Sequence, residues 1–385
     1  MKIMDLKDFK AGKWIKRLEY QSFSPEKINV QWLISDPALQ TLLSKADRNL
    51  GKLDAYSDLI PDIDFFIKMH ITKEATVSSK IEGTQTSFQE ALVKEQDLDP
   101  ERRDDWQEVH CYIDAMNRAM EEMIKLPIST RLIRQTHATL LQGVRGKEKL
   151  PGEFRSSQNW IGPSLKHAIF VPPMHDEISD LMSDLERFIH SDQDDPPSHV
   201  PHLIKIALIH YQFETIHPFL DGNGRIGRLL ITLYLLDKGI LQKPTLYLSD
   251  FFERNRRDYY DNLMRVREKN DLRSWLEFFL VGVIETTESS ISTFRQIILL
   301  RDRLELTELI KLGKKQADAK RLINELYKQP IVDTAAVAER LGVHFTTANR
   351  LIKDFQELGI LHELTGYKRN RIFAFNEYIN LFIQP

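Results

Sequence analysis

The chain has 385 residues, of which 42% are apolar and 28% are charged, so it is long enough for two or three folded domains and does not have the composition of a disordered protein. Its formal net charge of -3 gives no global electrostatic reason to expect nucleic acid or an anionic membrane as a partner. The single cysteine, Cys111, excludes an intrachain disulfide framework and a zinc-finger ligand set, and it fits a reducing compartment.

The N-terminal region gives few structural signals. Charged residues stand where a signal peptide needs an apolar run, and no run of about 18 apolar residues occurs in the chain. We therefore expect a cytoplasmic protein with no membrane partner. The strand-like alternation at residues 28–32 is too short to place a domain, so we interpret the first 55 residues as an adapter segment.

Amphipathic patterns then predict a series of helices. Apolar residues recur at helical spacing from Phe65 to Ile81, and the glycine that follows is a stop signal. Serine and threonine at the starts of the later patterns are typical helix caps. The predicted helices are one over about 62–83 that ends at Gly83, a second that Thr86 or Ser87 caps, a third over 105–125, and a fourth over 130–142 that Ser129 caps.

One segment departs from the helical pattern. Between Gly152 and Pro173, two extended-looking arms flank the turn sequence Gly162-Pro163-Ser164, which predicts a β-hairpin. It is the only clear hairpin signal before residue 360.

Two strongly apolar helices are predicted next. The first runs through 203–213 and ends at His217-Pro218, because the residue before a proline is disfavoured in the helical region. The second begins around Asn223 and continues to Gly239. Apolar residues on nearly all faces place this second helix at the centre of a bundle.

The loop between these two helices is polar and carries glycines, and burial without a ligand would leave its backbone N–H groups unpaired. Gly222 and Gly224 let backbone amides approach an anion, and Arg225 and Arg228 lie one turn apart at the positive end of the second helix. Two arginines there need a compensating negative charge. A polyphosphate would supply that charge.

Two further side chains in this loop suit phosphate chemistry. Asp221 can hold a magnesium ion against the same phosphates. His217 has a pKa suited to accepting a proton from an attacking hydroxyl near neutral pH. The alternative interpretation is a helix–loop–helix turn in which Asp221 is a cap and the arginines are solvated.

Residues 222–227 also satisfy the short pattern G-x-G-x-x-G. A dinucleotide-binding turn follows a buried β-strand, whereas this loop follows a helix and a His-Pro break. A protein-kinase interpretation fails because no strand lysine or His-Arg-Asp loop accompanies the glycines.

The twelve residues from His217 to Arg228 match every specified position of His-Pro-Phe-x-Asp-Gly-Asn-Gly-Arg-x-x-Arg, and so they resemble the signature of the Fic-domain family. The resemblance implies a mainly α helical bundle over about 110–290, in which the hairpin at 152–173 is a flap that aligns a target segment by strand pairing. It also implies transfer of AMP from ATP to a Tyr, Thr or Ser hydroxyl of a protein, with release of pyrophosphate.

The resemblance also assigns roles to residues of the motif. It makes His217 the base and Asp221 the Mg²⁺ ligand. The nucleotide-binding residues that it implies are Gly222, Asn223 and Gly224 as an anion hole for the α- and β-phosphates, Arg225 at the phosphates, and Arg228 at the γ-phosphate. One of the two tyrosines Tyr259 and Tyr260 would border the adenine, and we expect it to be Tyr260.

A second motif lies upstream. Residues 78–83, with Ser78, Glu82 and Gly83 at the defining positions, are similar to the family's inhibitory motif Ser/Thr-x-x-x-Glu-Gly/Asn. The resemblance implies that Glu82 pairs with Arg228 and occupies the place of the γ-phosphate. The alternative is a solvated carboxylate at the end of a helix.

The C-terminal region changes character after a helical stretch over about 274–327. Short helices over 335–341 and from Thr346 or Thr347 to Leu358, followed by extended runs at 360–364 and 371–375, resemble a winged helix-turn-helix. Basic residues on it could contact DNA phosphates, namely Arg350, Lys353, Lys368, Arg369 and Arg371. A role in binding protein is the alternative.

The sequence thus predicts three regions: 1–109 with the inhibitory helix, 110–290 as the catalytic core, and 291–385 as a linker helix with the winged helix-turn-helix domain. We hypothesise an autoinhibited protein adenylyltransferase that uses ATP and Mg²⁺. The alternatives are a nucleotide-sensing DNA-binding transcriptional regulator, or transfer of another phosphate-containing group. The sequence leaves open the target protein, self-modification, DNA binding and formation of a homodimer.

Overall fold

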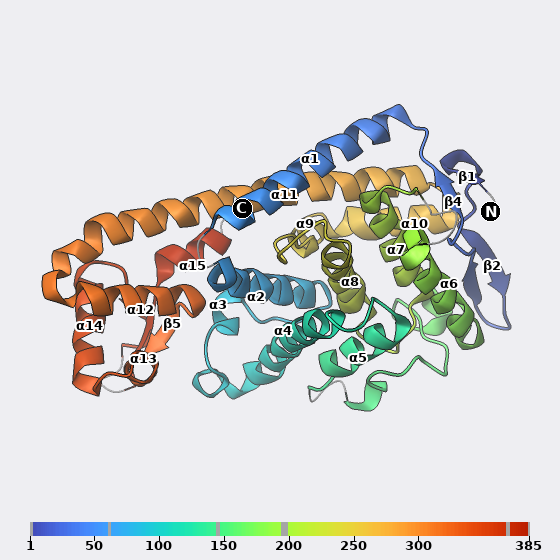
Figure 1. The fold of residues 1–385 in the computed structure, drawn as a ribbon. Helices are drawn as coiled ribbons and strands as arrows, with labels where there is room; N and C mark the ends of the chain where they lie inside the picture. The colour runs from blue at the N-terminus through green and yellow to red at the C-terminus, as the bar shows by residue number, and fades with distance from the viewer. Residues whose placement is uncertain (1–2, 61–62, 144–146, 194–198, 367–369, 384–385) are drawn as a thin grey trace.

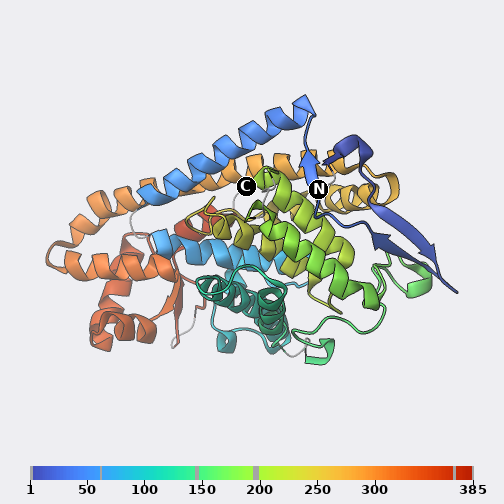
Figure 2. The ribbon, with the colours of Figure 1, turned by 45° about the vertical axis from the view of Figure 1, so that its right-hand side comes forward.

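The computed structural model describes residues 3–60, 63–143, 147–193, 199–366 and 370–383, and the fold is mainly α (Figures 1 and 2). The α-helices are α1 Pro37–Leu59, α2 Ile63–Ile81, α3 Phe88–Ala91, α4 Arg103–Met123, α5 Thr130–Leu140, α6 Ile178–His190, α7 His202–Ile216, α8 Asn223–Asp237, α9 Ser249–Arg254, α10 Arg256–Lys269, α11 Leu272–Arg303, α12 Gln316–Lys328, α13 Thr334–Leu341, α14 Phe345–Glu357 and α15 Asn376–Ile383. The strands are β1 Ile3–Asp5, β2 Gly12–Lys16, β3 Gln21–Pro25, β4 Gln31–Leu33, β5 Ile331–Asp333, β6 His362–Glu363 and β7 Ile372–Ala374.

Local capping signals set several helix starts, as the sequence predicts. The Ser129 side chain accepts a hydrogen bond from Leu132 N at the start of α5. Ser87 and Glu90 form a reciprocal capping box at α3. These serines satisfy backbone N–H groups that have no partner within the first turn of the helix.

The interpretation of residues 1–55 as an adapter segment is wrong. They contain a parallel β1–β4 pair, an antiparallel β2–β3 hairpin and most of the 23-residue helix α1. The hairpin also contradicts the prediction that residues 152–173 hold the only hairpin before residue 360. It packs on distant residues, since Phe23 N donates to Val171 O at 2.9 Å and the Trp14 ring lies edge-on to the Phe170 ring.

The predicted hairpin at 152–173 is also less regular than expected. Its two arms pair through one antiparallel bridge between Ile161 and Phe170, and the turn between them is wider than Gly162-Pro163-Ser164 and contains a short 3-10 helix at Leu165–His167. We keep the name flap for residues 152–173. The flap lies beside the β2–β3 hairpin through the contact with Val171.

Helix α8 lies at the centre of the bundle, as predicted, and α7 lies there beside it. Every α7 residue from Leu203 to Ile216 is buried. Helix α11, with 32 residues, passes over the bundle and lies beside α1 (Figures 1 and 2). Among the described helices, none combines the length and the apolar composition that a membrane span requires.

The helical stretch predicted over 274–327 is interrupted. Helix α11 ends at Arg303, and a π-helical turn at Leu304–Glu308 and a 3-10 segment at Leu309–Lys315 follow it. Gly313 has a φ of +54° inside that segment, where the chain direction changes before α12. Glycine allows this reversal because it has no Cβ atom.

We call the region that contains helices α12 to α15 and strands β5 to β7 the C-terminal domain. Helices α13 and α14 match the two predicted helices within one or two residues, and β5, β7 and β6 form a three-stranded antiparallel sheet in that order. The strands β6 and β7 are shorter than the predicted extended runs. Lys368 and Arg369 lie outside the described residues, and Arg371 forms an ion pair with Glu363.

The close packing of α9 against α11 generates a stability prediction. A Cβ atom at Gly282 in α11 would lie 2.6 Å from the Phe251 ring, whereas Gly51 in α1 has no atom within 4 Å of that position. We expect Gly282→Ala to lower the unfolding free energy by about 1–3 kcal/mol through overpacking. The matched change Gly51→Ala should raise the unfolding free energy by about 0.5–1 kcal/mol. Chemical denaturation measures both, and equal effects would contradict the expected contact.

Candidate active site

The predicted motif forms a tight loop between α7 and α8. Helix α7 ends at Ile216, His217 takes a left-handed conformation with a φ of +50°, and Gly222 takes a φ of +76° immediately before α8. A left-handed conformation is strained for a histidine, so neighbouring groups must hold it.

Arg155 supplies that support. Its buried guanidinium donates from Nε to the His217 carbonyl at 2.9 Å and from Nη2 to the Pro173 carbonyl at 2.6 Å. The Arg155 backbone N–H also donates to the Pro218 carbonyl at 2.9 Å. One arginine therefore fastens both ends of the flap to the loop that carries His217, a role that no local sequence signal indicated.

The Asn223 side chain closes the loop from the other side. Its Oδ1 accepts from Phe219 N at 2.8 Å, and its Nδ2 donates to Phe219 O at 2.8 Å. The amide is therefore occupied by the loop itself. The group that Asn223 can offer to an anion is its backbone N–H, together with the other N–H groups in the first turn of α8.

The environment of His217 differs from the sequence expectation. Burial, and then the cations Arg155 and Arg267, lower the pKa of His217 to about 3, instead of leaving it near neutral pH. Arg267 is buried nearby, where its Nη2 donates to the Glu214 carbonyl and its guanidinium stacks over the Phe170 ring of the flap. The His217 imidazole is therefore uncharged at neutral pH and able to accept a proton.

Asp221 and Arg225 lie together at the edge of the loop. Asp221 Oδ1 accepts from Gly222 N at 2.6 Å and lies 3.5 Å from Arg225 Nη2, while Glu108 Oε2 lies 3.7 Å from Arg225 Nη1. The buried Arg225 is thus held between two carboxylates. The Asp221 side chain keeps 47% exposure, so it remains accessible for a cation.

His137 positions Asp221 from beneath, and sequence reasoning missed it. Gly152 N donates to His137 Nδ1 at 2.9 Å, so the ring proton lies on Nε2, which donates to the Asp221 carbonyl at 3.0 Å. The His137 ring also stacks on the Phe219 ring, with 3.7 Å between the ring centres. Burial lowers the pKa of His137 to about 4, which keeps the ring in this neutral form.

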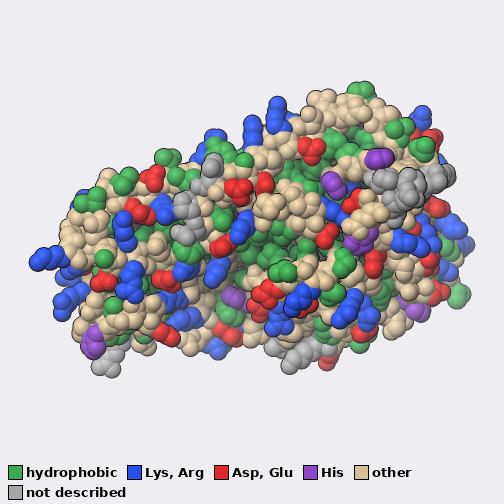
Figure 3. Space-filling view, viewed as in Figure 1, with side chains coloured by type: hydrophobic (Ala, Val, Ile, Leu, Met, Phe, Trp, Pro, Cys, Tyr) green, Lys and Arg blue, Asp and Glu red, His purple; other side chains and the backbone are tan. Residues whose placement is uncertain are grey.

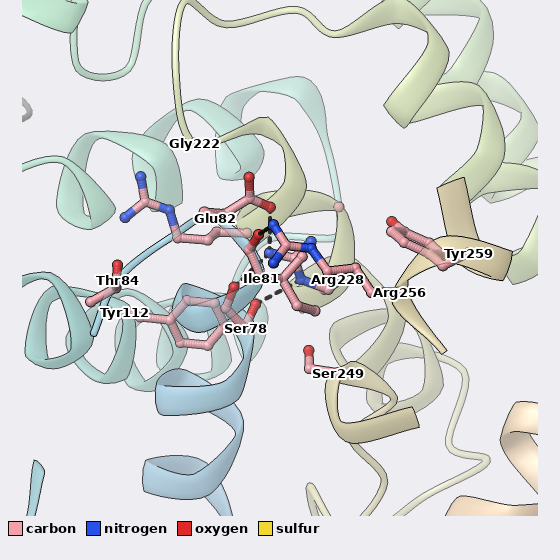
Figure 4. Close-up of polar contacts among 12 residues, drawn as sticks. Ser78, Ile81, Glu82, Thr84, Tyr112, Gly222, Arg228, Ser249, Arg256 and Tyr259 are labelled. Carbon is pink, nitrogen blue, oxygen red and sulfur yellow. Dashed lines mark hydrogen bonds and ion pairs between the residues drawn. The ribbon is translucent and has the colours of Figure 1, made fainter. Parts of the chain in front are cut away.

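Arg228 is a buried cation of the site and contacts the predicted inhibitory motif. Its Nε donates to Ser78 Oγ at 2.8 Å, and its Nη2 donates to the Ser78 carbonyl at 2.8 Å and to Glu82 Oε1 at 2.7 Å (Figure 4). The contact between Glu82 and Arg228 that the sequence suggests is therefore present. The ion pair raises the pKa of the Arg228 guanidinium.

The Glu82 carboxylate also lies directly on the start of α8. A Cβ atom at Gly224 would lie 2.2 Å from Glu82 Oε1 and 2.9 Å from Arg228 Nη1. Only a glycine leaves room for a carboxylate at this position. Glu82 thus occupies the place where the helix N-terminus would receive an anion.

The end of α2 is fixed by two further groups. Gly83 has a φ of +106° and turns the chain away after the helix. Arg256 Nη2 donates to the Ile81 carbonyl at 2.6 Å, so it caps the C-terminal end of α2 beside Glu82 (Figure 4). No local sequence signal indicated Arg256, because its acceptor is a main-chain group of a distant helix.

The two tyrosines at the start of α10 differ. Tyr259 is buried, its hydroxyl is hydrogen-bonded to His210 Nε2 at 2.9 Å, and its ring stacks on Phe252, so it belongs to the core. Tyr260 is 37% exposed, and burial together with Glu82 raises its pKa to about 12. The assignment of Tyr260 to the adenine stays a prediction.

Comparison with known families identifies two adjoining regions. Residues 40–121 match the Fic/DOC family N-terminal model, and residues 127–235 match the Fic/DOC family model. Protein adenylyltransferase Fic of Aedes aegypti is 30% identical over 195 residues, which are 50% of this chain and 34% of that protein. The namesake of Drosophila grimshawi is 29% identical over 170 residues, 44% of this chain and 31% of that protein. The aligned part thus spans about a third of the length of these relatives.

Solved structures show the same fold. A Fic family protein from Desulfovibrio desulfuricans G20 superposes with a TM-score of 0.56 at 20% identity, over 89% of this chain and 97% of that chain. Fic-1 (residues 134–508) from C. elegans superposes with a TM-score of 0.51 at 18% identity, over 69% of this chain and 75% of that chain.

The contacts of Arg155 generate a second prediction. Arg155→Met leaves buried carbonyl groups unpaired, so we expect the unfolding free energy to fall by about 2–4 kcal/mol and amide exchange at residues 216–222 to accelerate. Arg134, which bonds the backbone of Gly152 near the same flap but is 39% exposed, is the matched control. Arg134→Met should change the unfolding free energy by less than about 1 kcal/mol. Unchanged exchange at 216–222 in Arg155→Met would exclude a positioning role.

Glu214 generates a prediction about pH. Burial raises the pKa of Glu214 from 4.5 to about 7 in the folded protein. The folded state therefore binds more protons than the unfolded state between these values, and stability falls as the pH rises through this window. Below pH 4.5 we expect the unfolding free energy of Glu214→Gln to be close to that of the wild type. Between pH 4.5 and about pH 7 the wild type should lose stability and the variant should not, so the difference should grow in favour of the variant and then stay constant above pH 7. A pH-independent difference between the two proteins would contradict the raised pKa.

Proposed function

The chain carries both the Fic/DOC family N-terminal region and the Fic/DOC family domain and is therefore a Fic-domain protein, and on that premise we propose that it is an autoinhibited protein adenylyltransferase. The proposed reaction moves AMP from ATP to a Tyr, Thr or Ser hydroxyl of a protein and releases pyrophosphate. One observation carries the proposal: the Glu82 carboxylate lies on Gly224 and pairs with Arg228 at the start of α8.

The start of α8 suits a nucleoside triphosphate. Backbone N–H groups around Gly222 and Gly224 would bind phosphate oxygens, and the buried cations Arg225 and Arg228 would neutralise their charge. Glu82 takes the same space and the same cation. Two negative groups at one position repel each other, so Glu82 would exclude the productive pose of the γ-phosphate.

The neighbouring His217 suits the proton transfer. The target hydroxyl oxygen would form a bond to the α-phosphorus, the bond from that phosphorus to the leaving pyrophosphate oxygen would break, and the neutral imidazole would accept the hydroxyl proton. The low pKa makes His217 a weak base in the free protein. Bound phosphates would raise that pKa, because negative charge favours the imidazolium.

Asp221 would hold a magnesium ion. Its carboxylate is half exposed at the edge of the loop, and in the described ranges no cluster of three or more His, Cys, Asp or Glu side chains could hold a metal. Magnesium commonly binds through one or two carboxylates together with substrate phosphates, so one aspartate fits this ion. When bound, the ion would neutralise negative charge on the phosphates and the leaving pyrophosphate.

The proposal also covers the compartment, the residue at the nucleotide base, the target and the transferred group. We place the reaction in the cytoplasm because the single cysteine fits a reducing compartment. Tyr260 would border the nucleotide base. Self-modification and a homodimer remain within the proposal, and another transferred phosphate-containing group, such as UMP, phosphocholine or a phosphoryl group, is the alternative within the same site.

A DNA-binding regulator that only senses nucleotide is the second candidate. Helix α14 of the C-terminal domain favours it, because Arg350 and Lys353 are exposed on this second helix of the helix-turn-helix pair. On the face shown in Figure 3, basic side chains around the C-terminal domain are interspersed with acidic ones. This candidate requires ATP-dependent, salt-sensitive binding to duplex DNA without covalent transfer.

The test is incorporation of label from α-labelled ATP with magnesium into the purified protein and a lysate. We expect Glu82→Gly to raise labelling by about tenfold or more, because Arg228 and the start of α8 become free for phosphate. Adding His217→Ala should lower labelling by about a hundredfold or more. The melting temperature of Glu82→Gly should fall, because Arg228 stays buried without its partner.

Glu101, an exposed glutamate, gives the matched control Glu101→Gly, for which labelling should stay at the wild-type level. Chelation of magnesium should abolish labelling in each protein. If nucleotide binds but no variant transfers label, the transferase proposal is wrong and the regulator candidate takes its place.

A further inference from the structure

Helix α2 is shared by the site and the C-terminal domain. At its C-terminal end, Ser78 and the following Glu82 both contact Arg228. Its first half packs on α12 and α15 of the C-terminal domain. Buried residues occur on every face of this helix, from Phe66 to Ile81. Its exposed residues are few, with Lys68 and Lys80 among them, so the order of α2 depends on what packs against both of its halves.

Aromatic rings form the contact between α2 and the C-terminal domain. The Phe66 ring lies 5.4 Å from the Tyr327 ring of α12 and 6.1 Å from the Tyr378 ring of α15. One helical turn later, the His70 ring lies 5.1 Å from the Phe382 ring of α15. These separations fall within the range in which aromatic pairs add stabilisation beyond their buried area.

Charged groups reinforce the same boundary. The Lys94 ammonium lies 2.6 Å from an Asp333 carboxylate oxygen, which links the segment after α3 to the start of α13. The Lys328 ammonium lies 4.5 Å from the centre of the Phe65 ring on α2. We call this boundary, made by α2 and the α3 segment on one side and the C-terminal domain on the other, the docking seam.

The docking seam borders a polar cavity, which lowers the cost of separating its two sides. A cavity of about 40 Å³ lies between α2, α9, α11 and α15, and Phe382 forms part of its wall. Four buried polar atoms of its lining have no hydrogen-bond partner among the described residues: His70 Nε2, Glu74 Oε2, Tyr247 OH and Thr286 Oγ1. Polar groups of this kind gain hydrogen bonds to water when a boundary opens.

We propose that the C-terminal domain, docked on the first half of α2, is a second lock that holds Glu82 against Arg228, and that opening the docking seam raises transferase activity. This inference rests on the proposed function, because it concerns the regulation of the same site. It concerns a contact within one chain, and it needs no ligand in the cavity.

The coupling follows from the continuity of α2. The helix runs without interruption from the docking seam to the inhibitory motif, where Arg256 donates to the Ile81 carbonyl and Arg228 to the Ser78 carbonyl. When the first half loses its aromatic partners, helical order weakens along the whole segment, because most helical stability in proteins comes from tertiary packing. Glu82 then spends less time on Gly224. By thermodynamic reciprocity, removal of Glu82 must also loosen the docking seam.

The test uses the full chain and the variant Phe382→Ala, which removes a ring from the docking seam and leaves α13, α14 and the sheet in place. We expect labelling from α-labelled ATP to rise by about tenfold, without exceeding the level of Glu82→Gly. The double variant Phe382→Ala/Glu82→Gly should label like Glu82→Gly alone, since both changes act through the same contact. Amide exchange over residues 63–83 should accelerate in Phe382→Ala.

Leu351→Ala is the matched control, because this buried side chain of α14 belongs to the core of the C-terminal domain and lies outside the docking seam. It should leave labelling at the wild-type level. Lys94→Glu, which reverses an exposed charge facing Asp333, provides a second way to weaken the docking seam without removing a core side chain, and it should raise labelling in the same direction.

The two proposals fail in different ways. If Glu82→Gly itself transfers no label, the proposed function fails, while amide exchange over 63–83 still tests the coupling. If exchange at α15 shows that the docking seam has opened but exchange at 78–83 and labelling stay at wild-type levels, the second lock is wrong. Accelerated exchange at the docking seam in Glu82→Gly would give independent support from the opposite end of the helix.

Discussion

A buried guanidinium needs an anion, and the arrangement of this protein depends on how that need is met for Arg228. The side chain is only 2% exposed, and an unpaired cation at such depth would be strongly destabilising. Its oxygen partners come from Ser78 in the last turn of α2 and from Glu82, the residue that directly follows this helix. Helix α2 must therefore lie across the start of α8, and the region that precedes the bundle is an integral part of the site.

The same constraint explains two glycines at the start of α8. A glycine inside a helix costs about 1 kcal/mol relative to alanine, so its presence needs a reason. A Cβ atom at Gly224 or at Gly227 would lie 2.2 Å from a carboxylate oxygen, of Glu82 in the first case and Glu214 in the second. Carboxylates thus approach the backbone of one helix from two directions. These glycines provide space for charged groups, and the helix remains regular around them.

Sequence reasoning succeeded where the determining residues are neighbours in the chain. The caps at Ser87 and Ser129 and the turn between α7 and α8 depend on local chemistry, and the short inhibitory motif could be paired with Arg228 through resemblance to a family. It failed where the partner is remote. Strands β1 and β4 pair across 25 intervening residues, and the Arg155 donors reach carbonyls near residue 217. The low pKa of His217 likewise follows from burial and from cations on distant elements.

Helix α11 gives the molecule a mechanical property. With 32 residues it is about 48 Å long, and α1 lies along it as a second rod, so the pair forms a stiff strut from the bundle to the C-terminal domain. The irregular turns at 304–315 are the joint at the far end. Because α11 connects the C-terminal domain to the bundle, the domain stays close to the docking seam after it detaches. Its effective concentration there is high and does not depend on the concentration of the protein. Detachment would thus be a swing about one joint, and its reversal would be a fast first-order step.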